Sequence, residues 1–157
     1  MLNSVIADLE QVKKLVDMKP SWNDKEFDNA ALAVKSCPVH VNINTQNLDS
    51  LKSSLPSKEE IVKMFANPNL LEHDTFTDML WALYHLLDEL SNRQDIQALP
   101  KTDIGHLKGD IVRIYNLLTY EWVFYMKHLK LRYPYLWSLA LRKNPFSEHA
   151  SVIIQES

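Results

Sequence analysis

Residues 101–143 read KTDIGHLKGDIVRIYNLLTYEWVFYMKHLKLRYPYLWSLALRK, and this stretch decides the fold. Apolar residues recur in it every three or four positions, which is the spacing of one side of an α-helix. The pattern predicts a helix from about Asp103 to Arg132. Its core stripe is expected to consist of Leu107, Ile111, Ile114, Leu118, Trp122, Tyr125 and Leu129. Because Pro134 breaks or kinks a helix, a separate short helix is predicted from Tyr135 to Leu141.

Aromatic residues surround this long helix on nearly all sides. Tyr115 and Phe124 flank the stripe, and Tyr120 lies farther back. A helix with apolar side chains all round is normally a central, buried one. We therefore predict an all-α fold, a compact bundle of about five or six helices around the long C-terminal helix.

Weaker patterns cover the first hundred residues. Helices are predicted from Leu2 to Met18, from Asp24 to Lys35, after the capping box Ser57-Lys58-Glu59-Glu60, and from Asp74 or Thr75 to about Asn92. Residues 39–44 alternate apolar and polar side chains, which is the strand period. Such a short segment supports at most a minor β pairing.

Length and charge suggest one domain with uneven parts. A chain of 157 residues with 46% hydrophobic residues can bury a single core. Residues 1–100 form an acidic N-terminal part, residues 101–143 a basic and aromatic-rich part, and residues 144–157 a tail. The basic part could pack against the acidic remainder or serve an anionic partner.

The compartment is predicted to be the cytoplasm. The N-terminus lacks the basic start and apolar run of a signal peptide. Cys37 is the only cysteine, so the chain cannot form an internal disulfide. Apolar stretches are too short for a membrane span, which needs about 18 residues.

Gly105 and Gly109 are the only glycines. Phosphate-binding loops and the nucleophile elbow both need glycines in other places, so neither can be built, and no cofactor is favoured. The G-x-x-x-G spacing on the long helix predicts that another helix crosses closely at Gly105 and Gly109.

The predicted metal ligands are Asp110, Glu121 and His128. On a helix their spacings of eleven and seven residues place them within about 20° of one another, beside the core stripe. Such groups could bind a metal or transfer protons, or could pair with Lys or Arg from a neighbouring helix. A single helix would supply at most half of a di-metal site.

Two other sets are expected to be ordinary surface groups. Asp78, His85 and Glu89 share one side of their helix, but that side lies opposite Leu83 and is expected to face solvent. The spacing of His106, Asp110 and Arg113 is typical of ion pairs on a helix surface.

Aromatic and basic residues are interleaved from residue 127 to residue 143. The candidate interaction surface comprises Lys127, Lys130, Arg132, Tyr133, Tyr135, Trp137, Arg142 and Lys143. Such residues can bind single-stranded nucleic acid, lie on an anionic membrane, or form core and protein contacts. We expect the last of these, because this net acidic chain repels polyanions at long range.

No motif determines the function. The favoured hypothesis is a non-catalytic protein–protein interaction or regulatory helical module, whose partner is another protein or a second copy of the chain. One alternative is a metal-dependent or acid–base enzyme using Asp110, Glu121 and His128. The other is binding of an anionic polymer or a membrane surface through residues 127–143.

Overall fold

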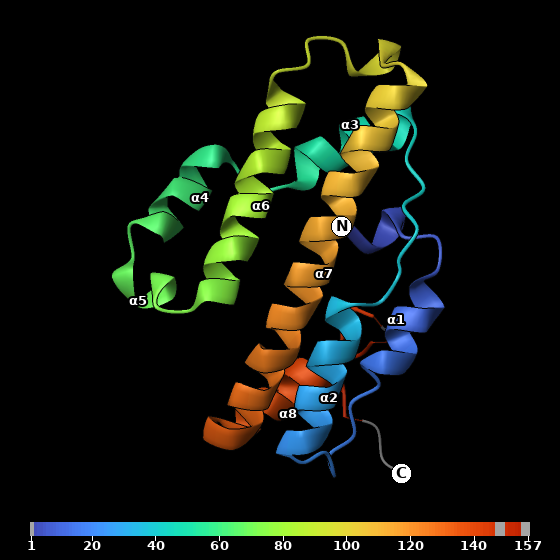
Figure 1. Cartoon of the computed structure of the whole chain (residues 1–157). Helices are drawn as coiled ribbons and strands as arrows, with labels where there is room; N and C mark the ends of the chain where they lie inside the picture. The colour runs from blue at the N-terminus through green and yellow to red at the C-terminus, as the bar shows by residue number, and fades with distance from the viewer. Residues whose placement is uncertain (1, 147–149, 155–157) are drawn as a thin grey trace. The chain divides into compact units, whose positions relative to one another are not determined.

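The computed structural model describes residues 2–146 and 150–154, and helices dominate them (Figure 1). These residues form the 3-10 helices η1 (Leu2–Val5) and η2 (Ile96–Ala98) and the α-helices α1 (Leu9–Leu15), α2 (Asp24–Lys35), α3 (Thr45–Ser54), α4 (Lys58–Phe65), α5 (Pro68–Leu71), α6 (Asp74–Ser91), α7 (Lys101–Arg132) and α8 (Pro134–Arg142). The all-α class is confirmed, with more helices than expected. None of the helices in the described ranges combines the length and apolar character that a membrane span requires.

Local signals explain most helix ends. The predicted helix from Asp24 to Lys35 is α2, and the Ser57 capping box opens α4 as expected. Pro134 occupies the first turn of α8, where its missing N–H leaves no helical hydrogen bond unmade. Sequence reasoning missed α3 because its capping box uses Asn44 and Asn47 in place of the more familiar Ser or Thr with Glu.

The predicted helix from Leu2 to Met18 is wrong in its middle. The chain forms η1 and then α1, and between them Ile6 makes an isolated antiparallel bridge to Val41. The Ala7 N–H donates to the His40 carbonyl at 2.8 Å, and the Asn42 N–H donates to the Val5 carbonyl at 2.7 Å. These non-local bonds replace helical bonds in this segment, and they are the minor β pairing that the sequence predicted.

The chain forms two compact units. Unit 1 comprises Met1–Ala7 and Pro38–Leu118, and unit 2 comprises Asp8–Cys37 and Thr119–Ser157. Helix α7 contributes its first part to unit 1 and its second part to unit 2. The division into parts 1–100, 101–143 and 144–157 of one domain stays a prediction.

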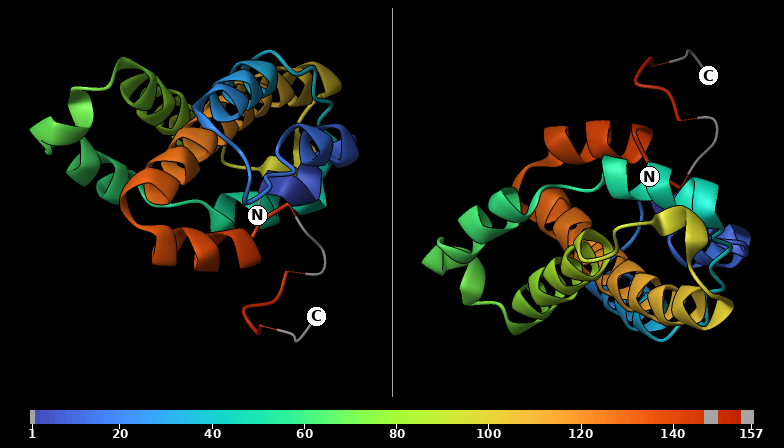
Figure 2. Two further views of the ribbon diagram at one scale, coloured as in Figure 1. Left: turned by 90° about the horizontal axis from the view of Figure 1, so that it is seen from below. Right: turned by 90° about the horizontal axis from the view of Figure 1, so that it is seen from above.

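Unit 1 is built on α6 and the first part of α7, which run antiparallel and side by side (Figures 1 and 2). The apolar face of α6 is buried through Met79, Leu80, Leu83, Leu86, Leu87 and Leu90, and that of α7 through Leu107, Ile111, Ile114 and Tyr115. Helices α4 and α5 lie on the side of α6 away from α7 (Figures 1 and 2). There Lys58 pairs with Asp88, and the ring centroids of Phe65 and Trp81 are 4.5 Å apart.

Unit 2 centres on Phe27 of α2. Its ring makes edge contacts with Trp22 at 5.2 Å and with Trp137 of α8 at 5.6 Å. The predicted core stripe needs correction here, because Tyr125 is 56% exposed whereas Val123 and Met126 are buried. The buried face of α7 in unit 2 therefore differs from the face that the apolar periodicity predicted.

Candidate metal centre

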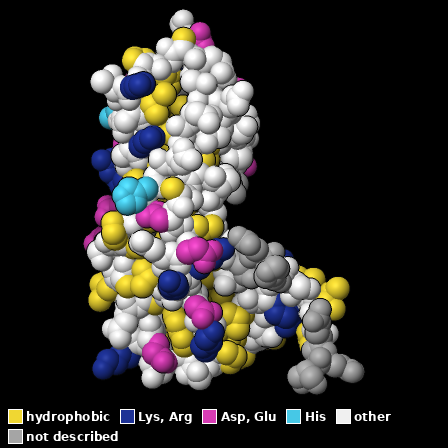
Figure 3. Space-filling view, turned by 90° about the vertical axis from the view of Figure 1, so that its right-hand side faces the viewer, with side chains coloured by type: hydrophobic (Ala, Val, Ile, Leu, Met, Phe, Trp, Pro, Cys, Tyr) yellow, Lys and Arg dark blue, Asp and Glu magenta, His cyan; other side chains and the backbone are white. Residues whose placement is uncertain are grey.

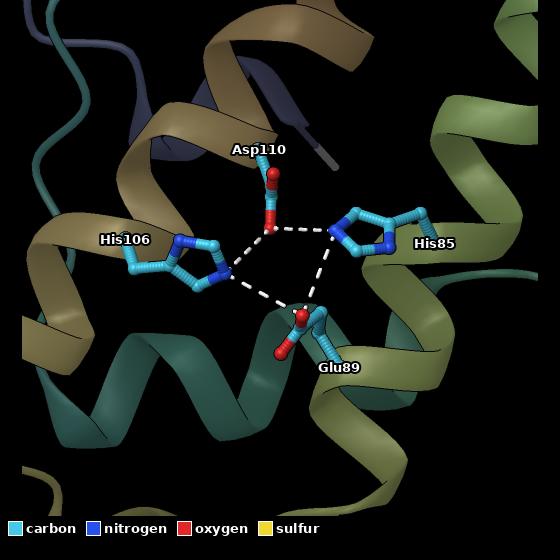
Figure 4. Close-up of side chains that lie close together, drawn as sticks. All are labelled: His85, Glu89, His106 and Asp110. Atoms are coloured by element: carbon cyan, nitrogen blue, oxygen red, sulfur yellow. Dashed lines mark hydrogen bonds and ion pairs between the residues drawn. The ribbon is translucent and has the colours of Figure 1, made fainter.

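Two neighbouring helices of unit 1 each carry a histidine followed four residues later by a carboxylate. His85 and Glu89 belong to α6, and His106 and Asp110 belong to α7. Residues four apart lie on the same face of a helix, one turn above the other. Because α6 and α7 are antiparallel, the two pairs face each other and their four side chains converge (Figure 4).

The converging atoms alternate between nitrogen and oxygen. His85 Nε2 lies 3.6 Å from Glu89 Oε1 and 3.4 Å from Asp110 Oδ2. His106 Nε2 lies 3.4 Å from Glu89 Oε1 and 3.5 Å from Asp110 Oδ2. All four ligand atoms lie within 4.8 Å of one another. His85 Nε2 therefore faces both carboxylates at similar distances, and His106 Nε2 does so too while making a long hydrogen bond to Glu89 Oε1.

These separations suit a shared cation better than direct hydrogen bonds. A good N–H···O bond has a donor–acceptor distance of about 2.7–3.2 Å, shorter than any of the four contacts. Two ligands of a tetrahedral ion with metal–ligand bonds of about 2.1 Å lie about 3.4 Å apart. The four nearest separations match this value, whereas the remaining ones extend to as much as 4.8 Å, so the four atoms form a flattened ring that would tighten around a small metal ion.

One side of the site is buried and the other is open. Asp110 is only 4% exposed, and among the described residues its Oδ2 has no hydrogen-bond partner. The side chains of His85 and His106 are 46% and 53% exposed. A buried carboxylate oxygen without a donor is costly, and a cation held by the two histidines would compensate its charge.

A second layer of charges orients the carboxylates. Arg93 donates from Nη1 to Glu89 Oε2 at 2.6 Å and from Nε and Nη2 to the two carboxylate oxygens of Asp103, also at 2.6 Å. These hydrogen bonds hold the pKa values of Glu89 and Asp103 below their usual range. Glu89 is therefore kept deprotonated, with Oε1 left to face the histidines. Such outer partners commonly fix the geometry of metal ligands.

Of the three ligands predicted from sequence, only Asp110 belongs to this group. Glu121 and His128 lie on the same helix but eleven and eighteen residues farther on, in the part that belongs to unit 2, and they are outside the group of four converging side chains. Glu121 Oε1 is buried without a hydrogen-bond partner among the described residues, and the exposed His128 packs beside Tyr133. Sharing an angular position on one helix does not bring residues within reach of one ion.

The sequence contained the correct residues in two separate sets. His85 and Glu89 were expected to face solvent, and His106 and Asp110 to form surface ion pairs. Asp110 is instead buried, because α6 covers that side of α7. The usable signal was the repeated spacing of His and carboxylate on two consecutive helices, placed at similar distances from the connection between them.

The predicted close helix crossing at Gly105 and Gly109 is wrong. Both glycines are exposed, and, apart from the adjoining residues and backbone of α7 itself, a Cβ atom added at either would meet no heavy atom of the described structure within 4 Å. Neither glycine has a positive φ. Packing and backbone geometry therefore give no reason for glycine on this face of α7, next to His106 and Asp110.

The basic and aromatic residues of the last helices do not form one exposed surface in unit 2. Trp137 is buried, Lys127 pairs with Asp28 at 2.7 Å, and Lys130 donates to the backbone carbonyls of Pro20 and Trp22. Exposed positions are occupied by Arg132, Tyr133, Tyr135 and Lys143, whereas Arg142 is half-buried and donates to Ser138. On the face shown in Figure 3, basic and acidic side chains are interspersed.

The fold and the site define a helical protein with two histidines and two carboxylates converging from adjacent antiparallel helices. Residues 1–142 match the family model described as the C-terminal helical domain of uncharacterized protein MJ1433, and the chain belongs to this family. Uncharacterized protein MJ1433 of Methanocaldococcus jannaschii is 41% identical over 151 residues, which cover 96% of this chain and 61% of that protein. The chain thus spans less than two thirds of this relative's length. No solved structure matches it.

Proposed function

We propose that unit 1 is a metal-binding helical module that holds one divalent transition-metal ion through His85, Glu89, His106 and Asp110. The observation that carries this proposal is the ring of two nitrogens and two oxygens at separations of 3.4–3.6 Å. The buried Asp110 Oδ2, which lacks a hydrogen-bond donor in the described structure, supports it. Ordinary ion pairs on a protein surface require neither a ring of four atoms nor a buried carboxylate oxygen.

The ligand types favour zinc, iron(II) or manganese(II). Imidazole suits zinc, copper, iron and nickel, whereas carboxylates suit harder ions such as manganese. The half-exposed histidines leave the solvent side of the site open. Four protein ligands complete a tetrahedral ion, so water or another ligand would bind an ion here as a fifth ligand from this open side, and the ion would supply Lewis-acid chemistry.

The direct test is zinc binding by the purified chain. We expect one zinc ion per chain and a rise in the melting temperature, since zinc at 100 times its Kd would stabilise the folded state by about 2.7 kcal/mol. Cobalt(II) should bind in competition with zinc and give visible absorption bands that report its coordination. A stoichiometry near zero by isothermal titration calorimetry, with an unchanged melting temperature, would refute the proposal.

A second candidate function rests on apolar surface in unit 2. Leu131, Tyr135 and Leu136 are 66%, 71% and 40% exposed, and Leu136 and Tyr125 line a hollow of about 310 Å³. We infer a protein contact or self-association here, in a cytoplasmic protein, because large exposed apolar groups commonly mark interfaces. The mass in solution tests self-association. A dimer that Tyr135→Asp converts to a monomer would support it, and a monomeric parent chain would contradict it.

A further inference from the structure

We propose that the metal site of unit 1 takes an anionic small molecule, with its oxyanion between the ion and Arg113 and a flat apolar group against Trp81. The oxyanion is a phosphate or a carboxylate. This inference rests on the proposed metal binding and adds a ligand class to it. Three features beside the site carry it: a hollow, a cation and an exposed aromatic ring.

The hollow adjoins the metal site and shares a residue with it. It has a volume of about 430 Å³ and is lined by Asp78, Trp81, Ala82, His85, Arg113 and Leu117. The lining comes from α6 and from the first part of α7, the two helices that supply the four metal ligands. Small-molecule sites usually occupy about 300–1,000 Å³. Since His85 belongs to both, the hollow borders the metal site on the side of His85 and Arg113.

Arg113 supplies the cation next to the ion. Its Nη1 lies 3.4 Å from Asp110 Oδ1, whereas Oδ2 of the same carboxylate faces the two histidines. The Asp110 carboxylate therefore separates the guanidinium from the metal position by its own width. A guanidinium has five N–H donors in a planar fork that matches phosphate and carboxylate, so donors beyond Nη1 can serve a ligand. An oxyanion could then be shared between Arg113 and the ion.

Trp81 supplies a fixed apolar surface. Its side chain is 58% exposed, yet its ring contacts Phe65 at 4.5 Å and Tyr84 at 6.1 Å. An exposed ring held by two others is preorganised to stack against a flat group. Ala82 and Leu117 add apolar lining, while the carboxylate of Asp78 disfavours an anion at its own side of the hollow. The oxyanion end is therefore directed to Arg113.

The glycines of α7 do not line the hollow, but they leave bare surface beside two of the metal ligands. Gly105, Gly109 and Arg113 follow one another at intervals of four, so they form one row on the helix beside the row of His106 and Asp110. No side chain stands on the first two positions, and no other atom of the described structure lies within 4 Å of where a Cβ would be. Glycines inside a helix cost about 1 kcal/mol each relative to alanine. The absence of side chains at these two positions would let a ligand approach the metal site without steric hindrance from them.

The test compares phenyl phosphate, inorganic phosphate and benzoate by calorimetry on zinc-loaded and metal-free protein. We expect phenyl phosphate to bind the zinc-loaded protein about tenfold more tightly than inorganic phosphate, and the metal-free protein much more weakly. Benzoate separates the two oxyanions, since a carboxylate site would prefer it to phenyl phosphate.

Three variants and a control assign the parts. Arg113→Gln, compared with the parent at saturating zinc, should weaken the binding of both phosphates about tenfold or more. Trp81→Ala should make phenyl phosphate bind no more tightly than inorganic phosphate. Asp78→Asn should raise the affinity for both phosphates. Lys101→Gln, which removes a similar charge from an exposed position of the same helix, should leave the affinity for both phosphates unchanged.

Zinc affinity is measured separately on every sample, so the two proposals fail in different ways. Zinc binding without a zinc-dependent gain for phenyl phosphate or benzoate overturns the ligand proposal alone. An unchanged phosphate affinity in Arg113→Gln also overturns the ligand proposal. Absence of zinc binding overturns both.

Discussion

Replacing His106 by Ala is expected to lower the zinc affinity of the protein by more than about 100-fold, because changes in outer-layer partners alone already cost about 10–100-fold. Asp110→Asn should have a comparable effect, since an amide oxygen carries no net charge to balance the ion. Both ligands come from α7, and calorimetric titration with zinc measures each loss directly.

The matched controls are His128→Ala and Glu121→Gln, which lie farther along the same helix. They change the same residue types, but they are outside the four-ligand group, so zinc affinity should stay within about twofold of the parent. A large loss in these controls, with His106→Ala unaffected, would instead restore the ligand set that sequence spacing predicted.

Asp110→Asn also separates a metal site from structural ion pairs. If His85 and His106 served only as partners for Asp110, the metal-free variant would lose folding stability. We expect the metal-free Asn variant to be at least as stable as the metal-free parent, because Asp110 is a buried charge whose contacts with His85, His106 and Arg113 are 3.4–3.5 Å long, beyond the range of good hydrogen bonds. Urea unfolding in the presence of a chelator provides this comparison.

Replacing Phe27 by Ala is expected to lower the free energy of unfolding by about 3–5 kcal/mol. Phe27 is only 2% exposed, and its ring lies between Trp22 and Trp137, with the Lys130 ammonium 5.9 Å from the ring centroid. Truncation leaves a cavity that the two neighbouring indole rings cannot fill. Urea unfolding followed by tryptophan fluorescence and by helical circular dichroism measures the change.

Leu32→Ala is the control for this variant. Leu32 belongs to the same helix but is 64% exposed, so its truncation should change the free energy of unfolding by less than about 0.5 kcal/mol. Equal effects of the two substitutions would mean that Phe27 is not at the centre of the unit 2 core.

The Arg93 cluster explains how α6 and α7 keep the register that the metal site needs. Arg93 follows the end of α6 and binds Glu89 of that helix, and it also pairs with Asp103 in the first turn of α7. The same guanidinium therefore orients a proposed ligand and ties together the two ends of the α6–α7 connection. Register errors of one turn would move His106 by about 5.4 Å and open the ring of ligands.

Local signals in the sequence determined the helical class and most helix ends. The Ser57 capping box, the Pro134 break and the apolar face of α6 act within a few residues, so they could be read without the fold. The tertiary structure alone decided which polar residues meet. His85 and Glu89 seemed solvated until the antiparallel register of α6 and α7 placed them beside His106 and Asp110. The separation of Glu121 and His128 from Asp110, by contrast, follows from their spacing along one helix. Periodicity reports the direction of a side chain around its own helix, whereas a metal site depends on separations of a few ångströms between atoms of different helices.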